Sequence, residues 1–235
     1  MERIRISGKN LGALALTSFC PRCFWLRMHC GDKLPYQIFP GIFSSIDSFS
    51  KRVTNVYYEK LGVVPEWLQE FGDLTKPVKS PHHSHFFVVD PETNIHLTGV
   101  PDEVFQRTDG SYFIADYKTA RFTDHQDRLL PLYEVQLNSY AYIGNRSELD
   151  PVSGIGLVYY EPQTELDTEG LDEVVTKDGF RMPFAGKLLE LQLQPDKIIP
   201  PLLRKVRQIY DKAVPDKARS CVDCERLDTL IKLVK

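Results

Sequence analysis

Hydrophobic and polar positions follow two rhythms along the chain, and the rhythm changes several times. Residues 11–30 carry apolar side chains at helical spacing, and so do residues 44–62, where serines stand at the start and Gly62 at the end. A loop marked by proline and glycine, residues 34–41, separates the two runs. The pattern therefore predicts two helices near the start of the chain.

The next part of the chain has the rhythm of strands. Three runs, residues 85–90, 95–106 and 111–120, are separated by the short sequences PETN and RTDG. Connections of this length favour an antiparallel meander.

Helical and strand patterns then alternate to the end of the chain. After a polar loop we expect a helix over residues 131–144 and a buried strand over 154–162. A long basic helix over 185–212, interrupted at Pro195 and again at Pro200 and Pro201, should follow. Helices, a meander, another helix, a strand and a closing helix together predict a single α/β domain.

Composition and charge narrow the function classes. The chain has 235 residues, of which 42% are hydrophobic and 26% charged, and no apolar run is long enough to span a bilayer. After the basic start, the apolar run LGALAL is only six residues long and leads to the bulky Phe19, so we expect a helix start rather than a signal peptide, and a cytoplasmic protein.

Charge is distributed unevenly along the chain. The net charge of −3 argues against a general polyanion binder, yet residues 1–33 hold six Lys/Arg against two Asp/Glu, and residues 197–219 hold seven against two. Acidic residues gather at 161–173. Two basic ends would form one basic surface if the fold brought them together, although solvated helix charges explain the same counts.

Asp116 and Lys118 are the first candidates for chemistry. They stand two apart in the strand-like run YFIADYKTA, so they project from one face of the strand, with Phe113, Ala115 and Tyr117 on the other. An acid and a lysine facing a core are unfavourable unless they have partners or a bound ion. An ordinary ion pair across a surface hairpin is the competing interpretation.

A second acid breaks the preceding strand pattern. Asp102 follows Gly99 and Pro101, which indicate a bend or bulge that re-aims side chains. Carboxylates from neighbouring strands can share a hard divalent cation, while a nearby lysine orients water or stabilises phosphate charge.

The order of these residues resembles that of a known family. GVPD, then DYK, then QLNSY with Gln136 and Tyr140 on one helix face, is similar to the PD-(D/E)XK nuclease superfamily and, more narrowly, to RecB-type exonucleases. The resemblance covers roughly residues 18–225. It implies a restriction-endonuclease-like α/β core, with a central mixed β-sheet flanked by helices.

The resemblance also implies roles for individual residues. Asp102 and Asp116, with the carbonyl of Tyr117, would bind Mg²⁺ or Mn²⁺, and with Lys118 they would form the catalytic set. Gln136 and Tyr140 would help to hold DNA.

The family has a metal-binding histidine on an early helix, and residues 44–62 contain none. Asp47 is the expected substitute, and Glu59 is a weaker one. Three histidines near the first strand are typical of loop residues: His82, His83 and His85.

Cysteine spacing predicts a metal centre. Cys20 and Cys23 form one C-x-x-C pair, and Cys221 and Cys224 form another, which together could complete a four-sulfur site for Zn²⁺ or a 4Fe–4S cluster. Unrelated thiols or a redox motif are the alternatives, but a redox motif needs only one pair. Cys30 is either spare or an alternative ligand.

The resemblance extends to this pattern. The AddB nuclease domain and CRISPR-associated adaptation exonucleases join their ends through an iron–sulfur cluster, with one cysteine before the core and three after it. This chain has two before and two after. The family favours 4Fe–4S, with zinc as the alternative, and such a centre would bring the two basic ends together.

The expected protein is thus one nuclease domain over residues 1–235. Its catalytic core would cover about 44–200, and residues 1–43 and 201–235 would form the cysteine region. The function implied is that of a metal-dependent DNA exonuclease acting on single strands or free ends, beside protein partners in DNA repair or CRISPR adaptation. A non-catalytic DNA-binding or complex-forming subunit and a zinc-stabilised interaction domain are the alternatives.

Overall fold

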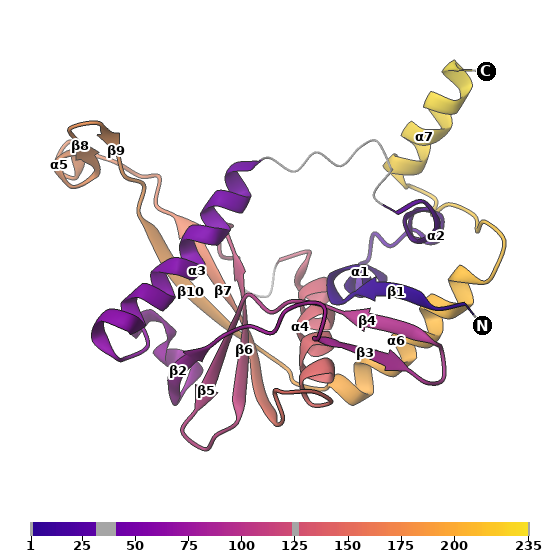
Figure 1. Ribbon diagram of the computed structural model, residues 1–235. Helices are drawn as coiled ribbons and strands as arrows, with labels where there is room; N and C mark the ends of the chain where they lie inside the picture. Colours follow the sequence, from indigo (N-terminus) through magenta and orange to yellow (C-terminus); the bar gives the residue numbers. More distant parts are fainter. Residues whose placement is uncertain (1, 32–40, 124–126, 235) are drawn as a thin grey trace.

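A five-stranded mixed sheet forms the centre of the computed structural model, which describes residues 2–31, 41–123 and 127–234 (Figure 1). The strand order is β10-β7-β6-β5-β2, in which β6 and β7 are parallel and the other neighbours antiparallel. The strands are Leu74–Val78 (β2), Glu103–Arg107 (β5), Tyr112–Lys118 (β6), Val152–Pro162 (β7) and Phe184–Leu191 (β10). The predicted central mixed sheet flanked by helices is confirmed.

The helix α4, Leu130–Gly144, connects the parallel pair β6 and β7. Such a crossover is needed because two parallel strands cannot be joined by a tight turn. The helix packs against β6 and β7 on one side and against α1 (Gly8–Gly12) and α6 (Pro195–Tyr210) on the other. Its predicted position, residues 131–144, and that of the strand β7 are confirmed.

The predicted antiparallel meander is confirmed only in part. Two antiparallel hairpins form, but the first, between β3 (Phe87–Asp90) and β4 (Ile95–Thr98), belongs to a separate three-stranded sheet with β1 (Ile4–Ser7). The predicted single strand 95–106 therefore breaks after Thr98. Gly99 follows the break, and it has no room for a side chain, because a Cβ there would overlap the ring of Tyr140.

The prediction of one helix over residues 11–30 was wrong. The chain forms α1, then a 3₁₀ turn at Ala13–Ala15 (η1), becomes extended at Leu16, and starts a second helix, α2, at Pro21–Cys30. Proline suits the first position of a helix, and the residue before it is driven out of helical geometry, as the extended Cys20 shows.

The helix α3, Gly41–Leu61, agrees with the predicted helix 44–62 and stops at Gly62, whose φ of 70° is in the left-handed region. It lies against β6 and β2. The 3₁₀ segment Glu66–Phe71 (η3) follows it and packs on β10. The predicted loop 34–41 lies almost wholly outside the described residues.

The prediction of a long basic helix over residues 185–212 was wrong for its first part and right for its second. Residues 184–191 form the edge strand β10, in which buried Leu189 and Leu191 alternate with exposed Glu190. Helix α6 begins with Pro195 at its first turn and runs through Pro200 and Pro201. The sequence patterns missed a small extension with α5 (Leu171–Val174), β8 (Val175–Thr176) and β9 (Gly179–Phe180), and a terminal helix, α7 (Val222–Leu233).

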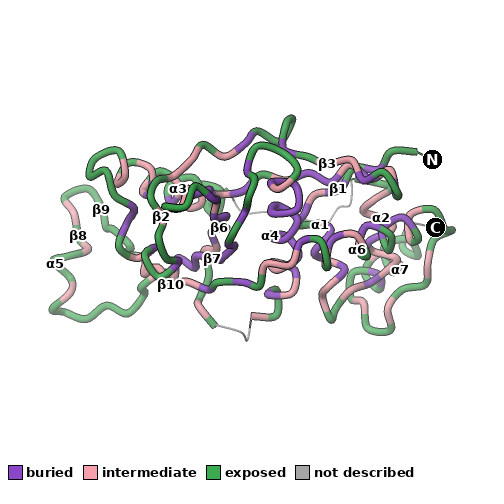
Figure 2. The backbone as a smooth tube through the Cα atoms, turned by 90° about the horizontal axis from the view of Figure 1, so that it is seen from below, coloured by how far each residue is buried: buried purple, intermediate pink, exposed green. Residues whose placement is uncertain are grey.

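Two hydrophobic clusters cover the two faces of the central sheet. Figure 2 shows that much of the buried chain belongs to the central strands and α4. Ile114 packs in the larger cluster with α4, α6 and the second sheet. Phe113, Ala115 and Tyr117 pack in the other, beneath η3. The predicted alternation along residues 112–118 is thereby confirmed, and it leaves Asp116 on the face that α4 covers.

Candidate functional site

A cavity of about 500 Å³ lies where β6, α3 and α4 meet. The residues that line it come from four elements and two adjoining loops, and they are Lys9, Phe43, Ser44, Asp47, Ser48, Asp102, Asp116, Tyr117, Lys118, Thr119 and Gln136. All five residues predicted for the catalytic and divalent-metal sites thus line one cavity. We call Asp102, Asp116, Lys118 and Gln136 the carboxylate site.

Asp116 is the most buried member of the site, with 2% of its surface exposed. One carboxylate oxygen accepts a hydrogen bond from Gln136 Nε2 at 2.8 Å, and the other contacts the ammonium group of Lys118. Burial raises the pKa of this carboxyl to about 7, with help from the charge of Asp102 and against the attraction of Lys118. A buried acid of raised pKa beside a lysine is a signature of functional sites.

Asp102 approaches the same strand from the bend before β5. Its Oδ2 accepts the backbone N–H of Tyr117 at 2.9 Å, which ties this carboxylate to the residue next to Asp116. Its Oδ1 pairs with the Nζ of Lys51 at 2.8 Å. The bend at Gly99 and Pro101 therefore does re-aim Asp102 toward β6.

Lys118 is held on two sides. Besides its contact with Asp116, its Nζ lies 4.3 Å from the centre of the Tyr133 ring on α4. A cation over an aromatic face is stabilised by about 1 kcal/mol at a partly buried position. The lysine is thus ordered at the cavity wall.

Gln136 and Tyr140 stand one helical turn apart on α4, and each is only 5% exposed. Gln136 Nε2 donates to both Asp116 and the hydroxyl of Tyr140, the latter at 2.9 Å. The carbonyl oxygen of Gln136 is buried without a hydrogen-bond partner among the described residues. Gln136 therefore supports Asp116 directly, Tyr140 supports it through Gln136, and one acceptor is left for a ligand or water.

These oxygen donors fit a hard divalent cation. Two carboxylates and the unpaired amide oxygen of Gln136 are the ligand types that Mg²⁺ and Mn²⁺ prefer. Tyr117, whose carbonyl is the further predicted ligand, also lines the cavity. The cavity of about 500 Å³ also leaves room for water, which Mg²⁺ retains in most protein sites.

The early helix brings Asp47 to this cavity, whereas Glu59 and the three histidines predicted as loop residues do not line it. Asp47 pairs at 2.9 Å with Lys51, one turn along α3. Burial alone would lower the pKa of Lys51, but the carboxylates of Asp102 and Asp47 raise it. Lys51 was not predicted from the sequence, although its i,i+4 spacing from Asp47 is a signal that could have identified it.

Polar side chains also connect α3 to the central sheet next to the carboxylate site, and we call Thr54, Asn55, Glu103 and Tyr117 the polar seam. Thr54 Oγ1 lies 3.1 Å from the Tyr117 hydroxyl, and Asn55 Nδ2 donates to Glu103 at 3.1 Å. Glu103 is buried, and burial raises the pKa of its carboxyl to about 7. The seam was not predicted, because its partners are far apart in sequence.

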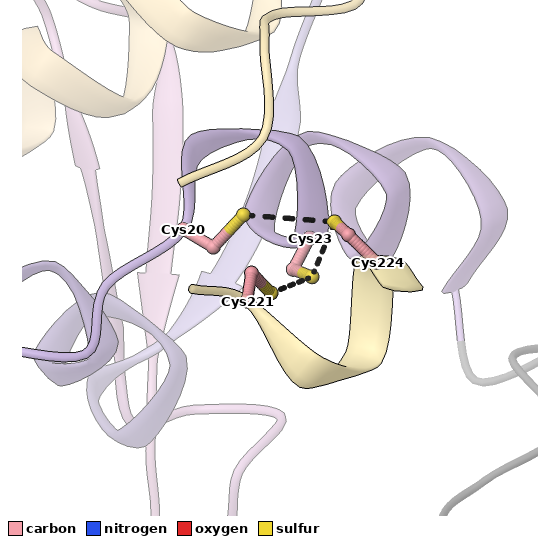
Figure 3. Close-up of side chains that lie close together, drawn as sticks. All are labelled: Cys20, Cys23, Cys221 and Cys224. Carbon is pink, nitrogen blue, oxygen red and sulfur yellow. Dashed lines mark hydrogen bonds between the residues drawn. The ribbon is translucent and has the colours of Figure 1, made fainter. Parts of the chain in front are cut away.

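The four paired cysteines converge although the pairs stand about 200 residues apart (Figure 3). Their sulfurs all lie within 4.8 Å of one another, and three pairs are 3.3, 3.4 and 3.7 Å apart. We call Cys20, Cys23, Cys221 and Cys224 the cysteine cluster. Cys30 is exposed and is not part of it.

The cluster is chemically suited to a metal. Tetrahedral zinc, about 2.3 Å from each sulfur, sets neighbouring sulfurs about 3.8 Å apart, which is slightly longer than the 3.3, 3.4 and 3.7 Å observed for three pairs. Burial raises the pKa of the Cys20 thiol, but the N–H of Ala218, which donates to its sulfur at 3.3 Å, and neighbouring groups lower it to about 7. The thiolate is the metal-binding form.

The cluster joins the two ends of the chain, as predicted. Helices α2 and α7 lie side by side (Figure 1), and Arg22 pairs with Asp228 at 3.1 Å. Trp25 Nε1 also donates to the backbone carbonyl of Lys212 at 3.0 Å. The two basic segments of the sequence are therefore neighbours in space.

Comparison with known proteins gives a family match and remote structural likenesses. The family model described as the PD-(D/E)XK nuclease superfamily matches residues 34–228, which is most of the chain. None of the curated proteins searched matches the chain.

Two solved structures are similar at low identity. The alkaline exonuclease LHK-Exo from Laribacter hongkongensis is 10% identical, with a TM-score of 0.44, and the match covers 98% of this chain and 91% of that one. The protein SSO0001 is 14% identical, with a TM-score of 0.40, and the match covers 91% and 79%. Of the helices that the structure describes, none combines the length and apolar character needed to cross a membrane.

Proposed function

The chain belongs to the PD-(D/E)XK nuclease superfamily, and from this membership we propose that it is a metal-dependent DNA exonuclease that hydrolyses phosphodiester bonds. The observation that carries the proposal is the convergence of Asp102, Asp116 and Lys118 on one cavity, with Asp116 almost fully buried. A surface ion pair, the competing interpretation of Asp116 and Lys118, does not account for this burial.

In this proposal, Asp102, Asp116 and the Tyr117 carbonyl hold a divalent ion, with Asp47 as a further ligand. Bound Mg²⁺ or Mn²⁺ supplies activation of water and neutralisation of phosphate charge. Gln136 and Tyr140 hold the Asp116 carboxylate in place, and their burial supports this positioning role more than direct contact with DNA. Lys118 stabilises the negative charge that develops on phosphate as the leaving oxygen departs.

The proposed substrate is DNA with single-stranded or free ends, bound along the basic segments next to the cysteine cluster. Lys and Arg side chains neutralise phosphates and release condensed counterions, so such a surface attracts DNA without reading its sequence. Residues 1–235 would act as one domain, beside protein partners in DNA repair or CRISPR adaptation. This part of the proposal rests on the resemblance to RecB-type exonucleases and on the charge distribution.

For the cysteine cluster we propose a structural metal centre. The resemblance points to a 4Fe–4S cluster. The sulfur spacing supports a single tetrahedral ion such as Zn²⁺, because in a four-iron cluster each thiolate binds a different iron and the sulfurs must spread apart. Metal analysis and the visible absorption of anaerobically purified protein separate the two.

A non-catalytic DNA-binding subunit is the second candidate. The observation that favours it is the ion pair between Lys51 and Asp102, which places a fixed positive charge beside a proposed metal ligand. A third class, an interaction domain stabilised by zinc, would not bind DNA at all.

The deciding experiment is digestion of end-labelled single-stranded and duplex DNA with and without Mn²⁺. We expect cleavage by the wild type, loss of cleavage in Asp116→Asn, Asp102→Asn and Lys118→Met, and retained cleavage in Asp172→Asn, which changes an exposed acid on α5. Circular dichroism checks the folding of each variant. Wild-type cleavage by folded Asp116→Asn would reject the proposed site, and DNA binding without cleavage by the wild type would favour the second candidate.

A further inference from the structure

Lys51 is the one cation of the α3 helix that lies between two carboxylates of the cavity wall. Its Nζ is 2.9 Å from Asp47 on the same helix and 2.8 Å from Asp102 on the bend before β5. About a third of its side chain is exposed, and Asp102 is more enclosed, at 19%. The lysine therefore connects α3 to the sheet at the cavity.

Both oxygens of Asp102 are already engaged. Oδ2 accepts the backbone N–H of Tyr117, and Oδ1 accepts the Lys51 ammonium. A carboxylate oxygen can accept more than one partner, but a divalent ion at Asp102 would then share that carboxylate with a full positive charge. Two cations on one carboxylate repel each other strongly in a partly enclosed site.

The polar seam also attaches α3 to the sheet, so the position of the helix does not depend on Lys51 alone. Thr54 and Asn55, the next residues on the same helix face, bond to Tyr117 and Glu103. The lysine can thus leave Asp102 without releasing the helix. Its stem is long enough to move the ammonium while the backbone stays in place.

We propose that Lys51 is a positioning residue that acts as a built-in counter-ion, which neutralises Asp47 and Asp102 in the metal-free protein and competes with the divalent ion for Asp102. The inference rests on the proposed function, because it requires a divalent ion at the carboxylate site. The ammonium group of Lys51 thus weakens metal binding, so that the site fills only when the concentration of the divalent ion is sufficient to displace the ammonium.

The test is a Mn²⁺ binding isotherm without DNA, on the full chain freed of loosely held divalent ions. Loss of the Lys51 charge in Lys51→Met should tighten Mn²⁺ binding by about tenfold or more, since the repulsion disappears. Lys51→Arg keeps the charge and should bind Mn²⁺ within about twofold of the wild type. Lys60→Met makes the same change at an exposed position of α3 and serves as the matched control.

Removal of the lysine should also lower the thermal midpoint of the metal-free protein and enlarge its rise on addition of Mn²⁺. If Lys51→Met does not fold, Lys51→Gln, whose amide can still donate to Asp102, replaces it in both measurements. Mn²⁺ binding that is unchanged or weaker in the folded, uncharged variant overturns the inference. Mn²⁺ binding that is also unchanged in Asp116→Asn overturns instead the proposed metal site, so the two failures are distinguishable.

Discussion

The buried carboxylate of Asp116 should make the metal-free protein less stable as pH rises. An ordinary aspartate has a pKa of 3.8, and burial raises that of Asp116 to about 7. Between these values the folded protein holds a proton that the unfolded chain has released. The folded state therefore binds more protons, and the free energy of unfolding falls as pH rises through this window.

Asparagine at this position resembles the protonated acid and does not titrate. Near pH 4, where the folded protein carries the proton, Asp116→Asn should change stability little. At about pH 8 it should avoid the desolvation of a buried anion, a difference of about 4 kcal/mol from the pKa values above. In a chain of this length that corresponds to roughly 10 °C in the thermal midpoint.

Urea unfolding followed by tryptophan fluorescence, at several pH values and without added divalent ions, measures this difference. The pair Asp116→Asn and Glu103→Gln provides a matched comparison, because burial raises the pKa of Glu103 to about 7 as well, yet Glu103 does not line the cavity. Both substitutions should weaken the pH dependence. Only Asp116→Asn should also abolish the stabilisation that Mn²⁺ gives the wild type.

Two results would refute this reasoning. The first is a gain in stability for Asp116→Asn that is the same at both ends of the pH range, since the effect would then not be titration. The second is full Mn²⁺ stabilisation of folded Asp116→Asn, since the carboxylate would then not hold the ion.

Two further predictions concern the cysteine cluster and the support of Asp116. Cys224→Ser should lose the bound metal and lower stability severely, because a structural metal can contribute about 10 kcal/mol to folding. Cys30→Ser, the control, should change neither metal content nor stability. Metal analysis and thermal unfolding measure both variants, and a wild type without stoichiometric metal would contradict the assignment. Tyr140→Ala should destabilise the fold by about 3–5 kcal/mol, because it leaves a cavity in the core. Tyr140→Phe loses only the hydroxyl that accepts the Gln136 hydrogen bond, so it should keep the fold and reduce cleavage. Equal urea midpoints for the two variants would contradict this prediction.

Much of the fold was predictable because it depends on local patterns. The helix α4 and the strands β6 and β7 have long, consistent runs, and the alternation along residues 112–118 predicted which face carries Asp116. The convergence of the four cysteines was also predictable, since thiols in two C-x-x-C pairs have few other uses in such a chain.

Local patterns failed where distant partners decide the structure. Residues 184–191 form a strand because they pair along the whole of β7, and an apolar run of that length suits either a helix or a strand until a partner is present. Similarly, β1 is a strand because β4 lies beside it. The long strand predicted over 95–106 is divided because β4 pairs in the sheet with β1 and β3, whereas β5 pairs in the central sheet with β2 and β6.

The sequence by itself determined the candidates for the chemistry, since the types and the order of Asp102, Asp116 and Lys118 predict a site, and the three residues do line one cavity. Only the tertiary structure decided how they are charged and supported. Burial beneath α4 raises the pKa of Asp116, and the packing of α3 brings Lys51 to Asp102 across 51 positions of sequence. Both effects depend on solvent exclusion and distance in space, and a linear order of residues specifies neither until the chain has folded.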